Sequence, residues 1–310
     1  MENLNVKKLS DIEAKPILRN RTWFEDLDYM YGTSNTSENS LGMPKGKISL
    51  WAGESGVGKS RLCIQVAKMF SINYSNGTVL YIQTESPLED FAGWTKDTKQ
   101  YDRIYCSGAD QIDDIIKIIY DVKPKLIFID SVNEIEDFTG NAKSVDRLIK
   151  GEGNKIGLKQ AVNDVGAHCI LLGQLNQDGK TIKGGTSLPH AVDVALNVVL
   201  VDPINGLFKV EVGVKNRYGK RDKIAQFQHT NDGVIAVERE KTKEEKDREF
   251  QEYDRKFRNS PEGKAYIKER WEANAHYRIA AEKEKEKERK AQNPGVYRQI
   301  GNLLGDMFGK

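Results

Sequence analysis

An eight-residue loop, Gly53–Ser60, constrains the fold of this chain more than any other part of its sequence. It reads GESGVGKS and matches the phosphate-binding pattern Gly-x-x-x-x-Gly-Lys-[Ser/Thr]. A short apolar segment ending at Ala52 precedes the loop, and Arg61–Phe70 after it has the residues of a helix. A strand, a glycine-rich loop and a helix in this order predict an α/β domain that binds phosphate through backbone N–H groups and a helix N-terminus.

The nucleotide-binding residues are expected in and beside this loop. Lys59 is expected to bind the β- and γ-phosphates of ATP, and Ser60 to bind Mg²⁺. A second magnesium residue is expected at the end of a buried strand, where Asp130 follows the four apolar residues Leu126–Ile129. The other residues expected to contact the nucleotide are Gly53, Glu54, Ser55, Gly56, Val57, Gly58 and Arg61.

Hydrolysis of ATP also requires a group that orients and deprotonates water. Glu85 follows the strand predicted at Val79–Gln83. If that strand neighbours the strand before the phosphate-binding loop, Glu85 lies at the sheet edge where ligands of open α/β sheets bind. The alternatives for this role are Glu54, Glu89 and Asp90.

A third predicted strand, His168–Gln174, leads into a hydrophilic, glycine-rich loop, Asn176–Ser187. We expect Gln174 at the strand end to sense the γ-phosphate and to pass its state to the loop. Lys180 and Lys183 in the loop are expected to contact the phosphodiester backbone of a nucleic acid. The alternative is an ordinary surface loop.

Strands alternate with helices between Lys47 and Val237. Apolar runs such as Leu126–Ile129 predict a mostly parallel sheet that is covered on both faces, and the closely spaced late strands predict an antiparallel extension. The predicted strands are Ile48–Ala52, Val79–Gln83, Lys125–Asp130, His168–Gln174, Leu196–Val201, Leu207–Lys215 and Ile224–His229. The predicted helices are Lys59–Phe70, Ile112–Asp121 and Gly157–Val165.

Composition divides the chain into four parts. Residues 1–45 are a lead-in expected to contact a neighbouring subunit, and residues 46–239 form the α/β core. Residues 240–293, rich in Lys and Glu, predict a solvated helical or partly disordered tail. Residues 294–310 carry an apolar stripe, which we expect to dock on a partner or to fold back on the core. The stripe consists of Ile300, Leu303, Leu304, Met307 and Phe308.

The overall composition excludes several classes of protein. The net charge is only +2, so any contact with nucleic acid must come from local patches. The three cysteines, Cys63, Cys106 and Cys169, are far apart and argue against a disulfide framework or a structural zinc site. We therefore expect a reducing, cytoplasmic location. No apolar run approaches the roughly 20 residues of a membrane span, so no membrane partner is expected.

The order of these motifs resembles the RecA superfamily, and within it the bacterial RadA/Sms branch, over roughly residues 8–238. The most discriminating segment is KNRYG at Lys215–Gly219, which is similar to the KNRFG signature of that branch. The other similar segments, in order, are KKLSDI at Lys7–Ile12, Leu27-Asp28, the phosphate-binding loop, VLYIQTES at Val79–Ser86, LIFIDS at Leu126–Ser131, Gly173-Gln174 and GGTSLPHAVD at Gly184–Asp193.

The sequence also departs from the RadA/Sms pattern. That branch carries an N-terminal zinc finger with four cysteines and a C-terminal domain related to Lon protease, whereas this chain has no paired cysteines and a charged tail. Its strand-end GQLN, beginning at Gly173, also resembles the SQLN of DnaB-type replicative helicases. We expect a RadA-like core without those parts, such as a phage would encode.

The resemblance implies an oligomeric ATPase, a ring (hexameric by analogy) or a filament, that moves on single-stranded DNA in recombination, repair or replication. It implies that Lys215 and Arg217 reach the γ-phosphate bound by a neighbouring subunit, whereas the local sequence alone suggests a basic surface turn. The alternatives are a filament-forming strand-exchange recombinase and a signalling ATPase of the same superfamily that binds no DNA. DNA polarity, subunit number and the partner of the tail stay open.

Overall fold

The computed structural model describes residues 16–33, 41–94, 102–136, 138–176 and 187–238, together with Lys8 and Ile182, and towards the C-terminus residues 251, 255–273, 283–288 and 291–292. The contacts of the chain divide it into two units, Met1–Arg239 and Glu240–Lys310. The first unit contains the sheet and the phosphate-binding loop.

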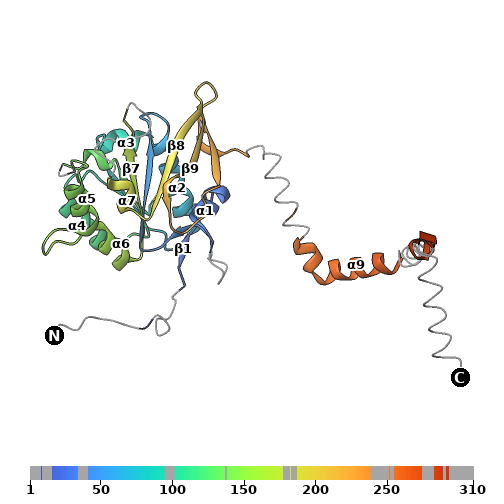
Figure 1. Cartoon of the computed structure of the whole chain (residues 1–310). Coiled ribbons are helices and arrows are strands. Elements are labelled where there is room, and N and C mark those ends of the chain that lie inside the picture. The colour runs from blue at the N-terminus through green and yellow to red at the C-terminus, as the bar shows by residue number, and fades with distance from the viewer. Residues whose placement is uncertain are drawn as a thin grey trace. The chain divides into compact units, whose positions relative to one another are not determined.

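A nine-stranded sheet forms the centre of the described part of this unit, in the order β11-β10-β9-β8-β3-β7-β6-β4-β5 (Figure 1). The six strands from β8 to β5 are parallel, and β9, β10 and β11 follow β8 in antiparallel pairs. The strands are β3 (Lys47–Gly53), β4 (Val79–Gln83), β5 (Ile104–Ser107), β6 (Leu126–Asp130), β7 (His168–Gln174), β8 (Val194–Asp202), β9 (Leu207–Asn216), β10 (Ile224–Thr230) and β11 (Gly233–Ala236). The predicted α/β fold with a mostly parallel sheet and an antiparallel extension is confirmed.

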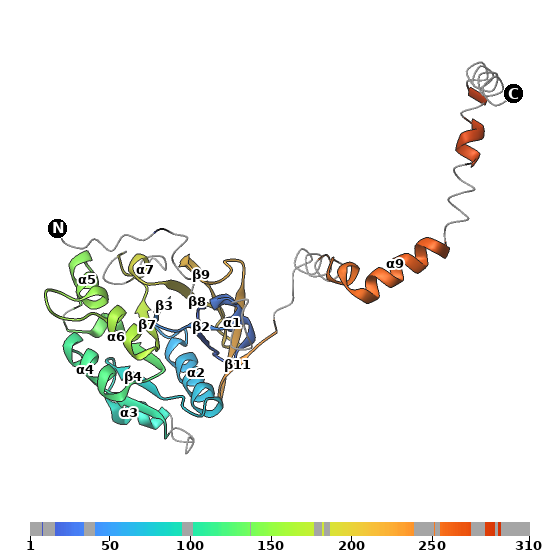
Figure 2. The same ribbon diagram turned by 90° about the horizontal axis from the view of Figure 1, so that it is seen from below.

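Helices cover both faces of the sheet (Figures 1 and 2). Buried side chains of α4, α5 and α6 pack on one face, and those of α1 and α2 pack on the other. The helices of this unit are α1 (Glu25–Tyr31), α2 (Lys59–Asn73), α3 (Leu88–Trp94), α4 (Ile112–Val122), α5 (Ala142–Lys150), α6 (Leu158–Val165) and α7 (Ser187–Ala191), with a 3₁₀ turn at Val132–Glu134.

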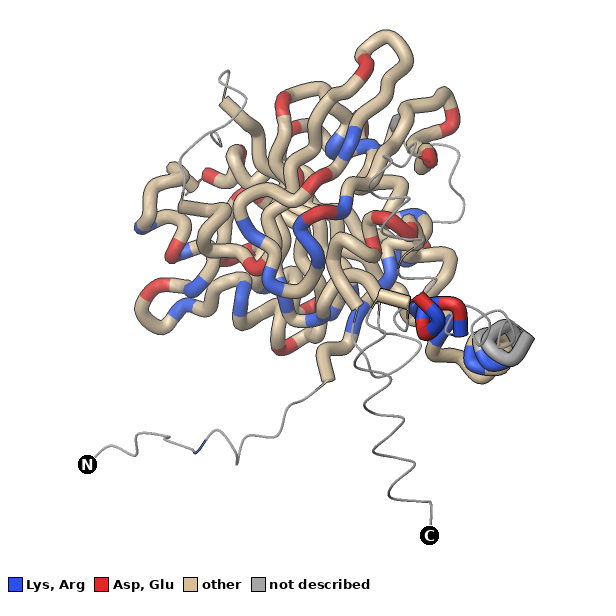
Figure 3. The backbone as a smooth tube through the Cα atoms, turned by 45° about the vertical axis from the view of Figure 1, so that its right-hand side comes forward, with Lys and Arg blue, Asp and Glu red and all other residues tan. Residues whose placement is uncertain are grey.

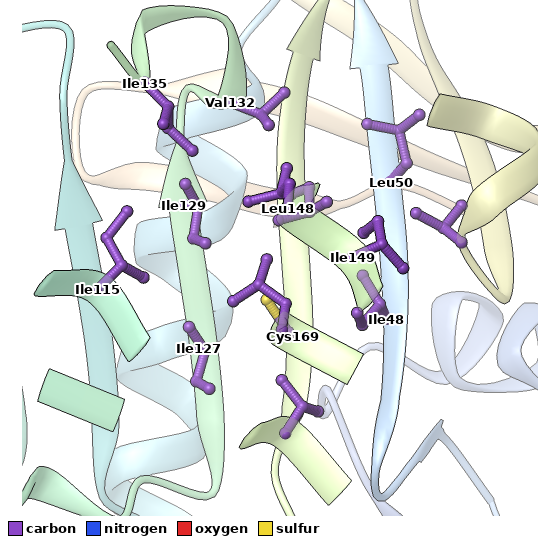
Figure 4. Close-up of a cluster of buried hydrophobic side chains, with 14 of the residues drawn as sticks. Ile48, Leu50, Ile115, Ile127, Ile129, Val132, Ile135, Leu148, Ile149 and Cys169 are labelled. Atoms are coloured by element: carbon purple, nitrogen blue, oxygen red, sulfur yellow. The ribbon is translucent and has the colours of Figure 1, made fainter. Parts of the chain in front are cut away.

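The strands consist of consecutive apolar residues because successive side chains are buried in the two clusters on opposite faces of the sheet. Ile127 and Ile129 of β6 lie in the cluster shown in Figure 4, together with residues of α4 and α5. Leu126 and Phe128 of the same strand belong to the cluster on the other face, against α1 and α2. Alternation along a strand therefore buries every residue when both faces are covered.

The segment that precedes the sheet contributes to this second cluster. Leu27, Met30 and Tyr31 of α1 are fully buried, and Trp51 Nε1 of β3 donates a hydrogen bond of 2.8 Å to Tyr31 Oη. Two short strands, β1 (Arg19–Asn20) and β2 (Met43–Pro44), form a separate antiparallel pair. The lead-in predicted at residues 1–45 thus supplies side chains to the core.

In the second unit, the longest described helix is α9 (Pro261–Ala273). Ser260 caps it: its hydroxyl accepts a hydrogen bond of 3.0 Å from the Gly263 N–H and donates one of 2.8 Å to the Phe257 carbonyl. The predicted stripe from Ile300 to Phe308 lies outside the described residues. Among the residues that are described, no helix has the length and apolar character required to cross a membrane.

Candidate active site

The phosphate-binding loop connects β3 to α2. Gly56 and Gly58 have φ angles of 77° and 105°, which favour glycine, and Gly58 is the N-cap of α2. No atom lies within 4 Å of the position that a Cβ on Gly56 would occupy. The loop backbone at Gly56 is therefore open to a ligand, at the N-terminus of a long helix.

A cavity of about 270 Å³ lies against this loop. It is lined by Ser55, Gly56, Gly58, Lys59, Ser60, Arg61, Glu85, Asp130 and Gln174. The structure thus brings four segments to one site: the loop, the segment after β4, the end of β6 and the end of β7. These are the carboxyl ends of parallel strands, where ligands of open α/β sheets bind.

Lys59 is the buried cation of the cavity. Only 7% of it is exposed, and its ammonium donates hydrogen bonds to the carbonyl oxygens of Gly53 (2.9 Å) and Glu54 (2.8 Å). Burial lowers the pKa of Lys59, while the nearby carboxylates of Asp130 and Glu85 raise it. A buried ammonium that lines the cavity beside the loop backbone is suited to bind the β- and γ-phosphates of a nucleotide.

Asp130 is the buried anion of the cavity, with 2% of its surface exposed. Its Oδ2 accepts a hydrogen bond of 2.7 Å from Tyr81 Oη, and its carboxylate also accepts one from Ser60. Burial raises the pKa of Asp130 in spite of these bonds, and Glu85 raises it further. The Asp130–Ser131 peptide bond is cis.

The Ser60 and Asp130 oxygens suit Mg²⁺. A hydroxyl and a carboxylate that meet at a cavity wall are hard oxygen ligands, and Mg²⁺ usually takes one or two protein oxygens together with phosphate oxygens and water. The helix N-terminus and Lys59 lie on the same wall, so phosphate oxygens can share the ion.

Glu85 and Gln174 form a hydrogen-bonded pair across the cavity. Gln174 Nε2 donates to Glu85 Oε1 at 2.6 Å, and the Gln174 N–H donates to Asn133 Oδ1 at 2.8 Å. Among the carboxylates considered for the water-activating role, Glu85 lines the cavity, whereas Glu54 and the residues of α3 are not part of its lining.

Glu85 lies at the cavity as expected, but the assumption that β4 is the neighbour of β3 is wrong. β4 does not neighbour β3, because β7 and β6 lie between them. Continuous apolar strands can pair in many orders, and their sequence does not state which. The side chain of Glu85 reaches the cavity because the segment after β4 meets the end of β7, as its bond to Gln174 shows.

Lys215 and Arg217 lie away from this cavity. Lys215 pairs in register with Ala195 of β8, which is opposite Leu50 of β3, three residues before Gly53. Lys215 Nζ donates hydrogen bonds of 2.6 Å to the carbonyls of His190 and Val192. Arg217 Nη1 lies 3.5 Å from Asp193 Oδ1.

Sequence reasoning missed a histidine beside the loop. His229 Nε2, on β10, lies 3.3 Å from the Val57 carbonyl oxygen, and its ring occupies the space that a Cβ on Gly58 would need, 2.1 Å away. His229 therefore gives Gly58 a packing reason as well as a conformational one. No local signal identifies this residue, because 172 positions separate it from Val57.

Lys180 and Lys183 lie outside the described residues. Cys63, Cys106 and Cys169 are free thiols. In the described ranges, no group of three or more His, Cys, Asp or Glu side chains is arranged to hold a metal.

No protein-family model matches the chain. It is 32% identical over 202 residues to the "DNA repair protein RadA" of Mycolicibacterium smegmatis, an alignment of 63% of this chain and 42% of that protein. It is 29% identical over 204 residues to RadA of Mycobacterium tuberculosis H37Rv, covering 63% and 40%. It is 26% identical over 233 residues to RadA of Streptococcus pyogenes serotype M1, covering 74% and 48%.

The chain spans less than half the length of these curated relatives. These alignments cover 63–74% of this chain, whose structure has the mostly parallel sheet, the buried Lys59 and the contact between Asp130 and Ser60. The chain therefore carries a RadA/Sms-like core of the RecA superfamily.

Proposed function

We propose that this chain is an oligomeric, cytoplasmic ATPase of RadA type that moves on single-stranded DNA during recombination, repair or replication. The proposal depends on one observation: the charged residues of the cavity and the basic pair Lys215 and Arg217 lie apart within the chain. Lys59, Glu85 and Asp130 line one cavity, whereas Lys215 and Arg217 lie on the same chain outside it.

Within the cavity, the loop N–H groups and Lys59 bind the β- and γ-phosphates. Mg²⁺ held at Ser60 and Asp130 would offset the negative charge of these phosphates. Glu85 orients the attacking water and accepts its proton. The Gln174 amide donates to Glu85 Oε1 and so holds the carboxylate in one orientation at the cavity.

The basic pair acts in trans in this proposal. Lys215 is level with Leu50 and two strands away from β3, so its Cα is about 10 Å across the sheet and about 10 Å along it from Gly53. Its ammonium is already bonded to two carbonyls of its own chain. Phosphoryl transfer gains much from a further cation on the γ-phosphate, and a neighbouring subunit of a ring or filament can present one.

Two further contacts belong to the same proposal. Lys180 and Lys183 bind DNA phosphates, and Gln174 at the end of β7 transmits the state of the γ-phosphate to the loop that contains them. The segment from Ile300 to Phe308 contacts a neighbouring subunit or a recombination or replication protein.

A mixed-subunit experiment tests the trans arrangement. One variant, Lys59→Ala, loses its own ATP site but keeps the basic pair. The other, Lys215→Ala/Arg217→Ala, keeps its ATP site but lacks the pair. Each variant alone has no complete site, whereas a mixture contains interfaces that join an intact cavity to an intact pair. We expect mixing to restore part of the ATPase rate.

Two controls make this result decisive. The first control monitors the exchange of subunits through energy transfer between labelled subunits. The second control is Lys68→Ala on α2, which removes the same charge as Lys59→Ala but should leave the ATPase rate of that subunit intact. No recovery in the presence of exchange would contradict the trans arrangement. The ATPase rate is also measured with and without single-stranded DNA, because the absence of stimulation would favour the signalling alternative. Imaging then separates rings from the filaments of a strand-exchange recombinase.

A further inference from the structure

A buried tyrosine of β4 donates a hydrogen bond to the carboxylate at the end of β6. Tyr81 Oη lies 2.7 Å from Asp130 Oδ2, and both residues are buried. A phenol has one proton to donate, and a hydrogen bond to a carboxylate is among the stronger kinds in proteins. Asp130 lines the cavity, whereas Tyr81 does not. Tyr81 therefore acts on a bound ligand through Asp130.

Two aromatic neighbours fix the ring of Tyr81. Its centroid lies 5.4 Å from that of Phe128, at an interplanar angle of 27°, and 4.6 Å from that of Phe91, at an angle of 35°. Tyr81 and Phe128 are opposite each other in the register of β4 and β6, and Phe91 comes from α3. Because protein interiors are closely packed, a buried ring in contact with two others keeps its hydroxyl in one place.

The residue that follows β4 fixes the main chain of Asp130. The Thr84 N–H donates a hydrogen bond of 2.8 Å to the Asp130 carbonyl, and Thr84 Oγ1 donates one of 2.8 Å to the Ser131 carbonyl. In the described part of the chain, the side chains that donate to the Asp130 carboxylate are those of Tyr81 and Ser60. Removal of the tyrosine hydroxyl leaves Ser60 as the donor, and the carboxylate becomes freer to turn.

The orientation of Asp130 matters because Mg²⁺ tolerates little distortion. Acidic and basic residues alternate along the backbone of the sheet-containing unit (Figure 3), so local groups rather than the net charge decide where a cation binds. At the cavity, the hydroxyl of Ser60 and the buried carboxylate of Asp130 meet. Mg²⁺ requires near-ideal octahedral geometry and usually takes one or two carboxylates from a protein. A single carboxylate that turns away therefore removes much of the protein's hold on the ion.

We propose that Tyr81 is a positioning residue of the magnesium site, whose hydroxyl keeps the Asp130 carboxylate in the orientation that binds Mg²⁺ together with Ser60. Groups that hydrogen-bond to a metal ligand typically lower metal affinity by about 10–100-fold when they are replaced. This inference rests on the proposed function, in which Ser60 and Asp130 hold Mg²⁺ beside the nucleotide. It adds a residue that controls the affinity of the metal from outside the cavity.

The substitution Tyr81→Phe tests the role of the hydroxyl, because it keeps the ring. Affinity for a fluorescent ATP analogue is measured with saturating Mg²⁺ and without metal, and the ratio of the two affinities reports the contribution of the ion. We expect this ratio, which we call the magnesium ratio, to fall by about 10–100-fold. The affinity without metal should stay unchanged, because the loop N–H groups and Lys59 do not depend on Tyr81. Binding of Mn²⁺ to the complex with ADP, followed by electron paramagnetic resonance, should weaken in the same way.

Tyr31→Phe is the matched control. Tyr31 is also fully buried, and its Oη accepts the hydrogen bond of 2.8 Å from Trp51 Nε1, so the control breaks a bond of a buried hydroxyl that does not involve Asp130. Both variants should lower the thermal midpoint, because each leaves a buried polar group without its partner. Only Tyr81→Phe should change the magnesium ratio.

Three outcomes would overturn the inference. One is an unchanged or higher magnesium ratio in Tyr81→Phe, and another is an equal fall in Tyr31→Phe, which would reflect lost stability alone. The third is a further fall when Tyr81→Phe is added to Asp130→Asn, because the tyrosine should act only through that carboxylate. Failure of the proposed function gives a different result: if Asp130→Asn by itself leaves the magnesium ratio unchanged, the ion is not held at Asp130.

A second variant covers the case in which Tyr81→Phe does not fold. Phe91→Leu loosens the ring of Tyr81 from the side of α3 and leaves the hydroxyl in the protein. The magnesium ratio should fall in the same direction but by less, with the affinity without metal retained. A ratio equal to that of the unaltered protein would contradict the positioning of Asp130 by the packed ring.

Discussion

At the scale of single residues, Glu85 is placed by a contact with Gln174 rather than by the order of the strands. Both residues line the cavity that contains Lys59 and Asp130, and the amide of Gln174 reaches Glu85 at 2.6 Å. This hydrogen bond holds the Glu85 carboxylate in one orientation at the cavity, as a group that accepts a proton from water requires.

The substitution Glu85→Gln should separate binding from hydrolysis. The amide can still bond to Gln174 but cannot take a proton, so we expect nucleotide affinity to remain and the ATPase rate to fall by about 10²–10⁴-fold. Equilibrium binding of a fluorescent ATP analogue and steady-state phosphate release measure the two effects. Glu89→Gln on α3 is the control; if it, and not Glu85→Gln, loses hydrolysis, the assignment is wrong.

A second residue-scale prediction concerns His168, which is fully buried at the start of β7. Its Nδ1 donates to the Pro44 carbonyl at 2.8 Å, and its Nε2 accepts from Ser49 Oγ at 2.7 Å. Burial lowers the pKa of His168 from 6.5 to about 4. The neutral ring therefore stabilises the fold fully above pH 6.5, and this contribution is lost as the pH falls towards 4, because only the unfolded chain is protonated in that window.

His168→Gln should flatten the pH dependence of unfolding in that window. At about 1.4 kcal/mol per unit, the histidine contributes at most about 3 kcal/mol to the change between the two pH limits. Denaturant unfolding at several pH values measures it, and His276→Gln in the second unit is the control. If the free energy of unfolding falls equally in His168→Gln and in the unaltered protein from neutral pH to pH 4, His168 is not the source of this pH dependence.

At the scale of elements, α1 and the turn after β9 are joined by the Asn216 side chain and by a close approach of their backbones. Asn216 Nδ2 donates to the Met30 carbonyl at 2.8 Å, and Asn216 Oδ1 accepts from the N–H groups of Tyr218 (3.1 Å) and Gly219 (2.9 Å). A Cβ on Gly219 would lie 1.8 Å from the Met30 carbonyl oxygen. The asparagine and the glycine of KNRYG thus shape the turn that presents Arg217.

Gly219→Ala should therefore destabilise the protein by about 1–3 kcal/mol, because backbone must move to admit the methyl group. Gly93→Ala in α3 is the matched control, since nothing lies within 4 Å of its Cβ position, and alanine favours a helix by up to about 1 kcal/mol. Thermal and denaturant unfolding compare the two. Equal stability of both variants would show that α1 and the turn separate freely.

The predicted DNA loop is the second element to test. Lys180→Ala/Lys183→Ala should weaken binding of single-stranded DNA irrespective of sequence, because each lysine neutralises a phosphate. The slope of log affinity against log salt should fall by about 0.7 for each lost contact, with ATP binding retained. Lys143→Ala/Lys150→Ala removes the same charge from α5 as the control. An unchanged slope would exclude the loop as a phosphate contact.

At the scale of the whole molecule, the chain consists of the sheet-containing unit Met1–Arg239 and the unit Glu240–Lys310. The predicted stripe at residues 300–308 lies at the end of the second unit. Burial of five such side chains at about 1.5–3 kcal/mol each would contribute several kcal/mol to docking after ordering costs.

Truncation after Asn293 should leave the ATPase rate and the thermal midpoint of a dilute sample unchanged and should impair assembly or partner binding. Analytical ultracentrifugation and a thermal melt measure these properties. Leu303→Ser/Leu304→Ser should reproduce the effect, whereas Asn302→Ser should not. A lower thermal midpoint of the dilute monomer would show instead that the stripe packs on the chain's own core.

The sequence determined the local parts of this fold. All seven predicted strands are present, and the helix after the phosphate-binding loop begins at Lys59 as expected. β5 was missed because it has four residues at the sheet edge and no run of buried side chains. α5 was missed because its nine residues are mostly polar, although Asn141 caps it. Motif spacing, apolar runs and caps are interactions between near neighbours, which a sequence states directly.

The tertiary structure alone decided how these parts meet. It placed β7 and β6 between β3 and β4, brought His229 against Gly58, and bound Lys215 to the end of α7. The physical reason is that pairing of strands and burial of faces depend on shape complementarity between segments that are far apart in the chain. Apolar strands of similar length satisfy the same local rules in several orders, and only the packed core selects one of them.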